Sequence, residues 1–147
     1  MRKSNHLEYL KKSDLVAIVS TAKYINKKDC QFAIKYIKKK GLNIVNLDNT
    51  ILSRKGMFSG SDTERVEMLQ SILDSPKVKA IFFARGGYGS IRIIDKLNFN
   101  KFIKDPKWLI GFSDITVFLS HVSKVYNLPT LHSPMPYNFP KTSKQSL

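Results

Sequence analysis

One serine in the chain is placed where it could act as a nucleophile. Residues 108–110 form an apolar run typical of a short buried strand, and after Gly111 the apolar side chains recur at helical spacing. Ser113 therefore falls in a predicted strand-to-helix turn, from which a side chain can project beside the free N–H groups of the helix N-terminus. No second glycine completes the usual G-x-S-x-G pattern. The alternative is that Ser113 or Asp114 simply caps the helix.

A glycine-rich turn follows another predicted strand, at residues 79–84. That strand leads into an arginine, three glycines and a tyrosine: Arg85-Gly86-Gly87-Tyr88-Gly89. The glycines allow positive φ and let the backbone approach a ligand or a developing oxyanion. The cluster could instead be a turn without chemistry. Arg85 could neutralise a substrate carboxylate, or be buried against an internal one.

Strands and helices alternate along the rest of the chain. We expect strands at residues 15–20, 43–47, 79–84, 108–110 and 130–132, and helices at residues 29–40, 61–75, 90–96 and 115–125, with a long polar loop at residues 48–60. This order predicts an α/β fold with a doubly wound, mostly parallel sheet and flanking helices. In such sheets the carboxyl ends of the strands form the binding crevice. Ser20 and Thr21 follow the first strand and could line it, or could hold the loop there.

Two histidines can be weighed as partners of the serine. His121 lies eight positions after Ser113, two helical turns away, which is too far to reach the serine oxygen. His132 follows the last predicted strand near the crevice, and we interpret it as a wall of the site or a structural residue. No cysteine–histidine cluster is present, so neither a metal site nor a cofactor is predicted.

Composition limits the class of protein. A chain of 147 residues, 42% of them hydrophobic, is long enough for one domain with a core. Cys30 is the only cysteine, which excludes an internal disulfide and fits a reducing cytoplasm. No apolar stretch is long enough to cross a bilayer. We therefore expect a cytoplasmic protein without a membrane partner.

The formal net charge of +14 raises the question of nucleic-acid binding, since basic surfaces bind phosphates. The charge is mostly lysine, spread along the chain, and no nucleic-acid motif accompanies it. The run of lysines at residues 38–40 closes a predicted helix, where cations favour the dipole. We interpret the charge as a compositional bias together with a solvated face, and we predict no nucleic-acid partner. Arg92 and Asp95, three positions apart, are expected to pair on the surface.

The two turns together resemble the LD-carboxypeptidase family of serine peptidases, which includes the microcin C immunity peptidases. The motifs that carry the resemblance are residues 85–89 with Arg92, residues 111–116, residues 132–135 and, more weakly, residues 59–65. Their order and spacing agree from about residue 14 to residue 138. Ser133 stands where the family usually has glycine, so this loop has less backbone freedom.

The resemblance implies a Ser-His-Glu triad with Ser113 as the nucleophile. It also implies an oxyanion hole made by the N–H of Asp114 and that of Gly87, with Gly86 as second choice. Arg85, Tyr88, Ser20, Thr21 and His132 are then expected to contact the substrate. The implied substrate is a cytoplasmic muropeptide that ends in D-alanine. The alternatives are a peptidyl-nucleotide of the microcin C type and a non-catalytic basic α/β module that binds a phosphate in the glycine turn.

In this family the glutamate and the histidine of the triad belong to a C-terminal domain. We therefore expect residues 1–13 to be an extension, residues 14–138 the nucleophile-bearing α/β domain, and residues 139–147 the start of a linker to a domain that this chain lacks. Such a chain should be inactive alone. The full-length form is expected to be a homodimer.

Overall fold

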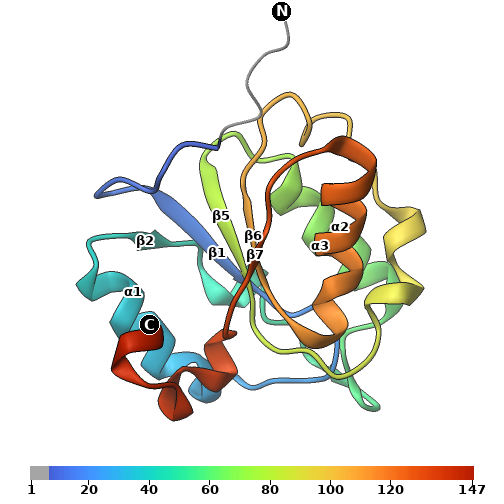
Figure 1. Ribbon diagram of the computed structural model, residues 1–147. Coiled ribbons are helices and arrows are strands. Elements are labelled where there is room, and N and C mark those ends of the chain that lie inside the picture. Colours follow the sequence, from blue (N-terminus) through green and yellow to red (C-terminus); the bar gives the residue numbers. More distant parts are fainter. Residues whose placement is uncertain (1–6) are drawn as a thin grey trace, which may run out of the picture.

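A five-stranded sheet forms the centre of the molecule. The computed structural model describes residues 7–147, and for Lys144 it describes the backbone only. The first six residues of the expected extension, which include His6, lie outside the described residues. The strands lie in the order β2 (Asn43–Ile44), β1 (Leu15–Val19), β5 (Val78–Phe83), β6 (Trp108–Gly111) and β7 (Leu131–His132), and all neighbours are parallel. The predicted α/β fold is confirmed (Figure 1).

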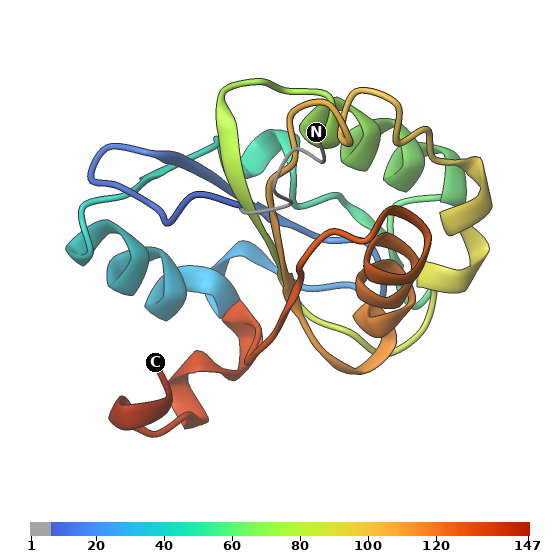
Figure 2. The ribbon, with the colours of Figure 1, turned by 45° about the horizontal axis from the view of Figure 1, so that its top comes forward.

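Helices cover both faces of this sheet. Helix α1 (Gln31–Lys39) lies on one face, and helices α2 (Asp62–Leu73) and α3 (Thr116–Tyr126) lie on the other (Figures 1 and 2). Because successive strand side chains point to opposite faces, Val16 and Ile18 join the core on the α1 side, while Ala17 and Val19 join the core under α2 and α3. Burial on both sides explains why β1 has no polar residue.

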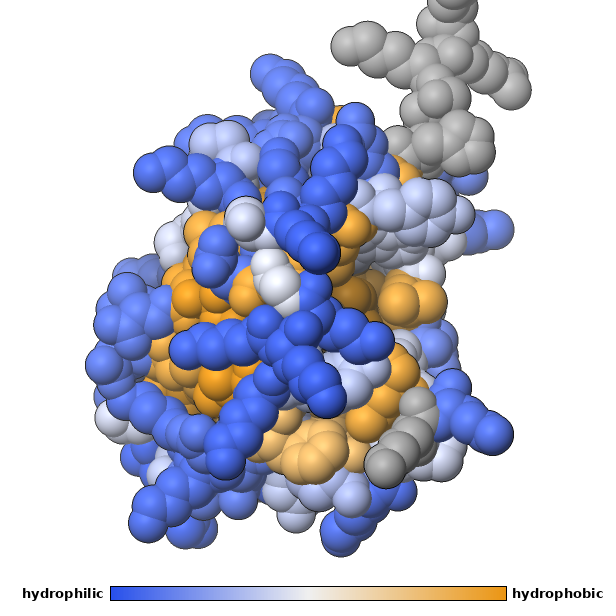
Figure 3. Space-filling view, turned by 90° about the vertical axis from the view of Figure 1, so that its left-hand side faces the viewer, coloured by the Kyte–Doolittle hydropathy of each residue, from blue (hydrophilic) through white to orange (hydrophobic). Residues whose placement is uncertain are grey.

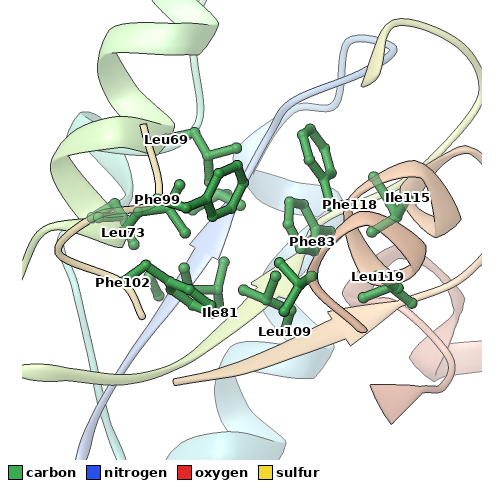
Figure 4. Packing of buried hydrophobic residues seen from close by; sticks show 14 of the residues in the cluster. Leu69, Leu73, Ile81, Phe83, Phe99, Phe102, Leu109, Ile115, Phe118 and Leu119 are labelled. Atoms are coloured by element: carbon green, nitrogen blue, oxygen red, sulfur yellow. The ribbon is translucent and has the colours of Figure 1, made fainter. Parts of the chain in front are cut away.

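Aromatic rings join α2 and α3 to the sheet in the larger core (Figure 4). Phe83 of β5 stacks on Phe118 of α3, with ring centroids 5.2 Å apart. Phe99 and Phe102 come from the connector before β6 and meet edge to face at 5.8 Å. Such pairs add about 0.5–1.5 kcal/mol each beyond the apolar area that they bury.

Polar side chains fix both ends of α2. The predicted capping box is present: the Ser61 hydroxyl accepts the Glu64 N–H (3.2 Å), and the Glu64 carboxylate accepts the Ser61 N–H (2.7 Å). At the other end, buried Lys107 donates to the carbonyls of Leu73 (2.7 Å) and Ser75 (2.9 Å). Its burial lowers the pKa of the ammonium, and its position places a cation at the negative end of the helix dipole.

Two expected elements are shorter or tighter than the sequence suggested. The strand predicted at residues 43–47 ends at Ile44, because the Asn46 side chain accepts the Asp48 N–H (3.0 Å) and begins a 3₁₀ turn. The helix predicted at residues 90–96 is a pair of 3₁₀ turns, Ser90–Arg92 and Ile94–Lys96.

Two other segments carry structure that was not expected. The loop at residues 48–60 contains a small hairpin, β3 (Arg54–Lys55) with β4 (Phe58–Ser59). After β7, a 3₁₀ segment at Pro136–Lys141 packs against α1, where buried Phe139 meets the Tyr36 ring edge to face at 5.9 Å. The segment expected to begin a linker at residue 139 therefore starts within a packed turn.

An apolar groove lies beside α1, on the sheet face opposite α2 and α3. It has a volume of about 340 Å³, and Figure 3 shows apolar side chains on this side of the molecule between hydrophilic ones. Its apolar lining comes from β5, β6, β7, α1, the turn between α1 and β2, the 3₁₀ segment Pro136–Lys141 and the two ends of the described chain: Leu10, Tyr36, Ile37, Leu42, Phe82, Ile110, Leu131, Phe139 and Leu147. Among the described residues, no helix is long and apolar enough to span a bilayer.

The capping box predicts an acid-sensitive contribution to stability. Hydrogen bonds from Ser61, followed by the pairing with Lys55, lower the pKa of Glu64 from 4.5 to about 2. A carboxylate with a lowered folded-state pKa stabilises the fold above its unfolded pKa, and this stabilisation is lost as the pH falls. We expect the difference in Tm between the protein and Glu64→Gln to shrink as the pH falls from about 4.5 to about 2. Glu67→Gln, a change of an exposed carboxylate on the same helix, controls for the loss of one charge. A pH-independent difference would contradict the assignment.

Candidate active site

Ser113 lies at the carboxyl end of β6, in the 3₁₀ turn Ser113–Ile115 that leads into α3. The turn of residues 111–115, here called the elbow turn, holds Ser113 at a φ of +60°. Left-handed backbone costs a residue with a side chain about 1–2 kcal/mol. Ser113 is nevertheless exposed, so the strained backbone projects a hydroxyl away from the sheet, as a nucleophile elbow does.

Gly111 allows the elbow turn to close on the core. A Cβ at this position would lie 2.8 Å from Cγ2 of Ile115. Ile115 is fully buried beneath α3. The packing of Ile115 in the core therefore requires a glycine at position 111.

The glycine-rich turn at residues 85–90, here called the glycine loop, lies directly against the serine. A Cβ on Gly86 would be 3.3 Å from Cβ of Ser113, 3.4 Å from its Oγ and 3.4 Å from the Asp114 nitrogen. Gly87 next to it has a φ of +118°. The loop backbone and the first N–H groups of the α3 segment thus converge near the Ser113 hydroxyl, which is the arrangement that an oxyanion hole needs.

A pocket of about 170 Å³ opens in front of these two turns. Its walls come from the glycine loop, the elbow turn and the segment after β7: Arg85, Gly86, Gly87, Phe112, Ser113, Met135, Tyr137 and Asn138. The Tyr137 N–H donates to the carbonyl of Ala84 (3.0 Å), so the segment after β7 is tied to the strand that carries the glycine loop.

Arg85 is the cation of this pocket. Its guanidinium is half-buried, donates to the carbonyl of Tyr24 (3.3 Å) and lies 4.6 Å from the centre of the Tyr137 ring. No ion pair within residues 7–147 involves Arg85. The internal carboxylate considered as its partner is therefore absent from the described part of the chain.

Tyr88 lies on the other side of the glycine loop. Its exposed ring meets the ring of Phe58, with centroids 6.1 Å apart. It is not among the residues that line the pocket in front of Ser113.

Ser20 and Thr21 are buried at the end of β1. The Ser20 hydroxyl donates to the carbonyl of Thr50 (3.2 Å) and accepts the Leu52 N–H (3.0 Å), and the Thr21 carbonyl accepts a hydrogen bond from Arg65 (2.7 Å). These contacts match the loop-holding alternative. Neither side chain lines the pocket in front of Ser113.

The two histidines occupy different surroundings. His132 is exposed at the end of β7, and its ring meets the ring of Phe112 at 6.0 Å. It lines a neighbouring pocket of about 390 Å³. His121 lies in α3, and its ring centroid is 5.1 Å from that of Phe99 and 5.5 Å from that of Tyr126. This aromatic cluster does not include Ser113. Within residues 7–147, no group of three or more His, Cys, Asp or Glu side chains could hold a metal ion.

The prediction that Ser113 or Asp114 caps the α3 segment is wrong. Neither the elbow turn nor α3 has a side-chain cap. The carboxylate of Asp114 instead accepts the N–H of Ser90 (3.0 Å), across the gap between the elbow turn and the glycine loop. The Asp114 carboxylate thus accepts a backbone N–H of the neighbouring glycine loop and none from the start of its own helix.

Arg65 is a structural residue of the site that the sequence did not reveal. It is fully buried, donates from Nη1 to the carbonyls of Thr21 (2.7 Å) and Gly89 (3.2 Å), and pairs with Asp62. Its guanidinium also lies 4.7 Å from the centre of the Phe58 ring. Two signals were available: Arg65 ends the weaker motif at residues 59–65, and it stands three positions before Met68 and four before Leu69, on the buried face of α2.

The expected pairing of Arg92 with Asp95 is also wrong. Arg92 Nε donates to both carboxylate oxygens of Asp62 at 3.0 Å, and Nη2 lies 2.9 Å from Oδ2. The reason is the tight 3₁₀ geometry after the glycine loop, which turns Arg92 toward the start of α2. This hydrogen bonding, together with the charge of Arg65, lowers the pKa of Asp62.

Comparison with known proteins agrees with this fold. The family described as LD-carboxypeptidase N-terminal domain matches residues 16–133. The chain therefore belongs to the LD-carboxypeptidase family of serine peptidases, through the N-terminal domain of that family.

Relatives and solved structures show how much of such proteins this chain covers. It is 32% identical over 126 residues to the probable murein peptide carboxypeptidase of Bacillus subtilis, covering 86% of this chain and 39% of the relative. A muramoyltetrapeptide carboxypeptidase from Oxalobacter formigenes superimposes with a TM-score of 0.72 at 30% identity, covering 83% of this chain and 40% of that chain. An MccF-like protein from Bacillus anthracis gives a TM-score of 0.79 at 24% identity, covering 91% and 41%. The chain spans about two fifths of the length of these proteins.

Because Ser113 has a strained backbone, we expect it to make the fold less stable than a glycine at the same position would. Ser113→Gly should raise the free energy of unfolding by about 1 kcal/mol, because glycine adopts positive φ without a Cβ clash. The matched control is Ser120→Gly, an exposed serine within α3, which should lower stability by about 0.5 kcal/mol. Urea denaturation of both variants measures the two values. A loss of stability in Ser113→Gly would contradict the strain.

Proposed function

We propose that this chain is the nucleophile-bearing part of a serine LD-carboxypeptidase that removes the C-terminal D-alanine from a muropeptide. The observation that carries the proposal is the position of the exposed Ser113 hydroxyl, which is held at positive φ and lies 3.4 Å from the place that a Cβ on Gly86 would take. The family membership and the murein peptide carboxypeptidase of Bacillus subtilis as a relative support the substrate class. We place the enzyme in the cytoplasm, as a homodimer in its full-length form.

In the proposed mechanism, Ser113 Oγ attacks the carbonyl carbon of the amide bond to D-alanine. The N–H of Asp114 and the N–H of Gly87, or of Gly86, donate to the oxygen that becomes negatively charged. Removal of one such donor in a serine protease costs about 3–4 kcal/mol of transition-state stabilisation. The hydroxyl needs a general base to act as a nucleophile, and we assign that base to the His and Glu of the C-terminal domain.

Substrate contacts come from the walls of the pocket. Arg85, which has no carboxylate partner among the described residues, would bind the terminal carboxylate of the substrate. His132 would form an outer wall beside Phe112. Tyr88 would contact the substrate from the outer face of the glycine loop, while Ser20 and Thr21 would act through the loop that they hold.

A peptidyl-nucleotide of the microcin C type is the second candidate substrate. The microcin C7 self-immunity protein MccF, solved in complex with aspartyl sulfamoyl adenosine, shares the fold, with a TM-score of 0.80 at 22% identity. A basic module that binds phosphate remains a candidate from another functional class, because the net charge is +14 and glycine turns before helices bind anions.

Activity of the full-length enzyme tests the proposal. With this chain joined to its C-terminal domain, Ser113→Ala should lower the release of D-alanine from a muramoyl tetrapeptide by at least about a thousandfold. Ser120→Ala, which changes an exposed serine of α3, should leave turnover unchanged. The 147-residue chain alone should show little or no turnover. Activity that survives Ser113→Ala would dismiss the mechanism.

The same enzyme separates the three candidates. Cleavage of an aspartyl-nucleotide in preference to the tetrapeptide would favour the microcin C type. Strong retention on heparin that disappears at moderate salt, without labelling of Ser113 by a serine-directed reagent, would favour the binding module. Release of D-alanine with no comparable release of L-alanine from the matched peptide supports the murein substrate.

A further inference from the structure

We propose that Arg65 and Asp114 hold one peptide bond of the glycine loop, the bond between Gly89 and Ser90, and thereby position the oxyanion-binding backbone against Ser113. This inference rests on the proposed function. It makes both side chains positioning residues, which act through the loop backbone and not through the substrate.

Arg65 holds the carbonyl of this peptide bond. Its Nη1 donates to the Gly89 oxygen (3.2 Å) and to the Thr21 oxygen (2.7 Å), and the side chain is fully buried. A Cβ on Gly89 would lie 2.5 Å from Nη1, and Gly89 has a φ of +135°. Glycine is therefore required at position 89 so that the buried guanidinium can reach the carbonyl.

Asp114 holds the other polar group of the same peptide bond. Its Oδ2 accepts the Ser90 N–H at 3.0 Å. The carbonyl and the N–H of one peptide unit point in opposite directions in one plane. A donor from α2 on one side and an acceptor from the elbow turn on the other therefore fix the orientation of that plane.

The orientation of this peptide plane matters because the other glycines of the loop leave its backbone many conformations to choose from. Gly87 precedes Gly89 by two residues, and glycine has the widest choice of φ and ψ. An oxyanion hole lowers the barrier only when its donors are held in place before the reaction begins. Because Asp114 directly follows Ser113, its side chain links the position of the nucleophile to that of the loop that receives the oxyanion.

Amide exchange measures the proposed lock directly in the 147-residue chain. The Ser90 amide should exchange at least about ten times faster in Asp114→Ala than in the parent, because its acceptor is lost. Asp114→Asn keeps an acceptor oxygen, so the amide should stay protected. Asp95→Ala, a change of an exposed carboxylate near the loop, is the matched control and should have no effect. Equal exchange in the parent and Asp114→Ala would overturn the lock.

Kinetics of the full-length enzyme measure the consequence of the lock. We expect Asp114→Ala to lower kcat about 10- to 100-fold with KM changed less than about threefold, because the oxyanion donors act mainly in the transition state. Asp114→Asn should recover most of kcat, and Asp95→Ala should equal the parent. A parent-like kcat in Asp114→Ala, or no recovery in Asp114→Asn, would overturn the inference.

Arg65→Lys tests the other half of the lock. Lysine keeps the charge but cannot reach several carbonyls in a fixed fork, so kcat should fall about tenfold while the Ser90 amide stays protected by Asp114. A parent-like kcat in a folded Arg65→Lys enzyme would remove Arg65 from the assignment.

If Ser113→Ala retained activity, the proposed function itself would fail, whereas full loss in Ser113→Ala with normal Asp114→Ala kinetics would reject only the lock.

Discussion

The close approach of the Gly86 backbone to Ser113 is the constraint on which the candidate site depends. The space that a Cβ on Gly86 would take is only 3.3–3.4 Å from Cβ and Oγ of the serine and from the Asp114 nitrogen. The tight fit favours a residue without a side chain on one turn, and the other turn holds Ser113 at a strained φ of +60°. Strain of about 1–2 kcal/mol is tolerated because Ile115, two residues later, is locked in the core. The geometry of the candidate site is therefore stabilised by packing outside the pocket.

The sheet supplies this approach through the order of its strands. β5 and β6 are parallel neighbours, with Ala80 opposite Trp108 and Phe82 opposite Ile110, so the turns that follow them begin at similar heights. Helices α2 and α3 both cover the same face (Figure 2). Consequently, a residue of α2, Arg65, and a residue that precedes α3, Asp114, reach the glycine loop from its two sides. Without this pairing of strands, the elbow turn and the glycine loop would not lie side by side.

The sequence predicted what local patterns determine. Apolar runs located the strands, and the capping box at Ser61 located the start of α2. Each of the two turns has an ordinary structural explanation by itself, and they could be recognised because together they resemble the motifs of one family. The backbone carbonyls that Arg65 binds, and the partners of Asp114 and Arg92, could not be predicted, because each of these contacts joins residues 24 to 44 positions apart. A short spacing such as that of Arg92 and Asp95 suggests a helical pair, and the 3₁₀ turn removes the geometry on which that pair depends.

The cations beside the candidate site make more ion pairs with one carboxylate than the lysines elsewhere on the surface do. Exposed ion pairs contribute little, about 0–1 kcal/mol each, and most lysines whose burial the structure describes are exposed. Asp62 is different, since Arg65, Arg92 and Lys96 all pair with it. One carboxylate thus gathers three cations beside the glycine loop, and the hydrogen bonds of Arg92 keep its pKa low. Of these cations, only Arg65 is fully buried. Asp62 therefore compensates the one charge whose burial the loop geometry requires, since a buried guanidinium without a carboxylate would be costly.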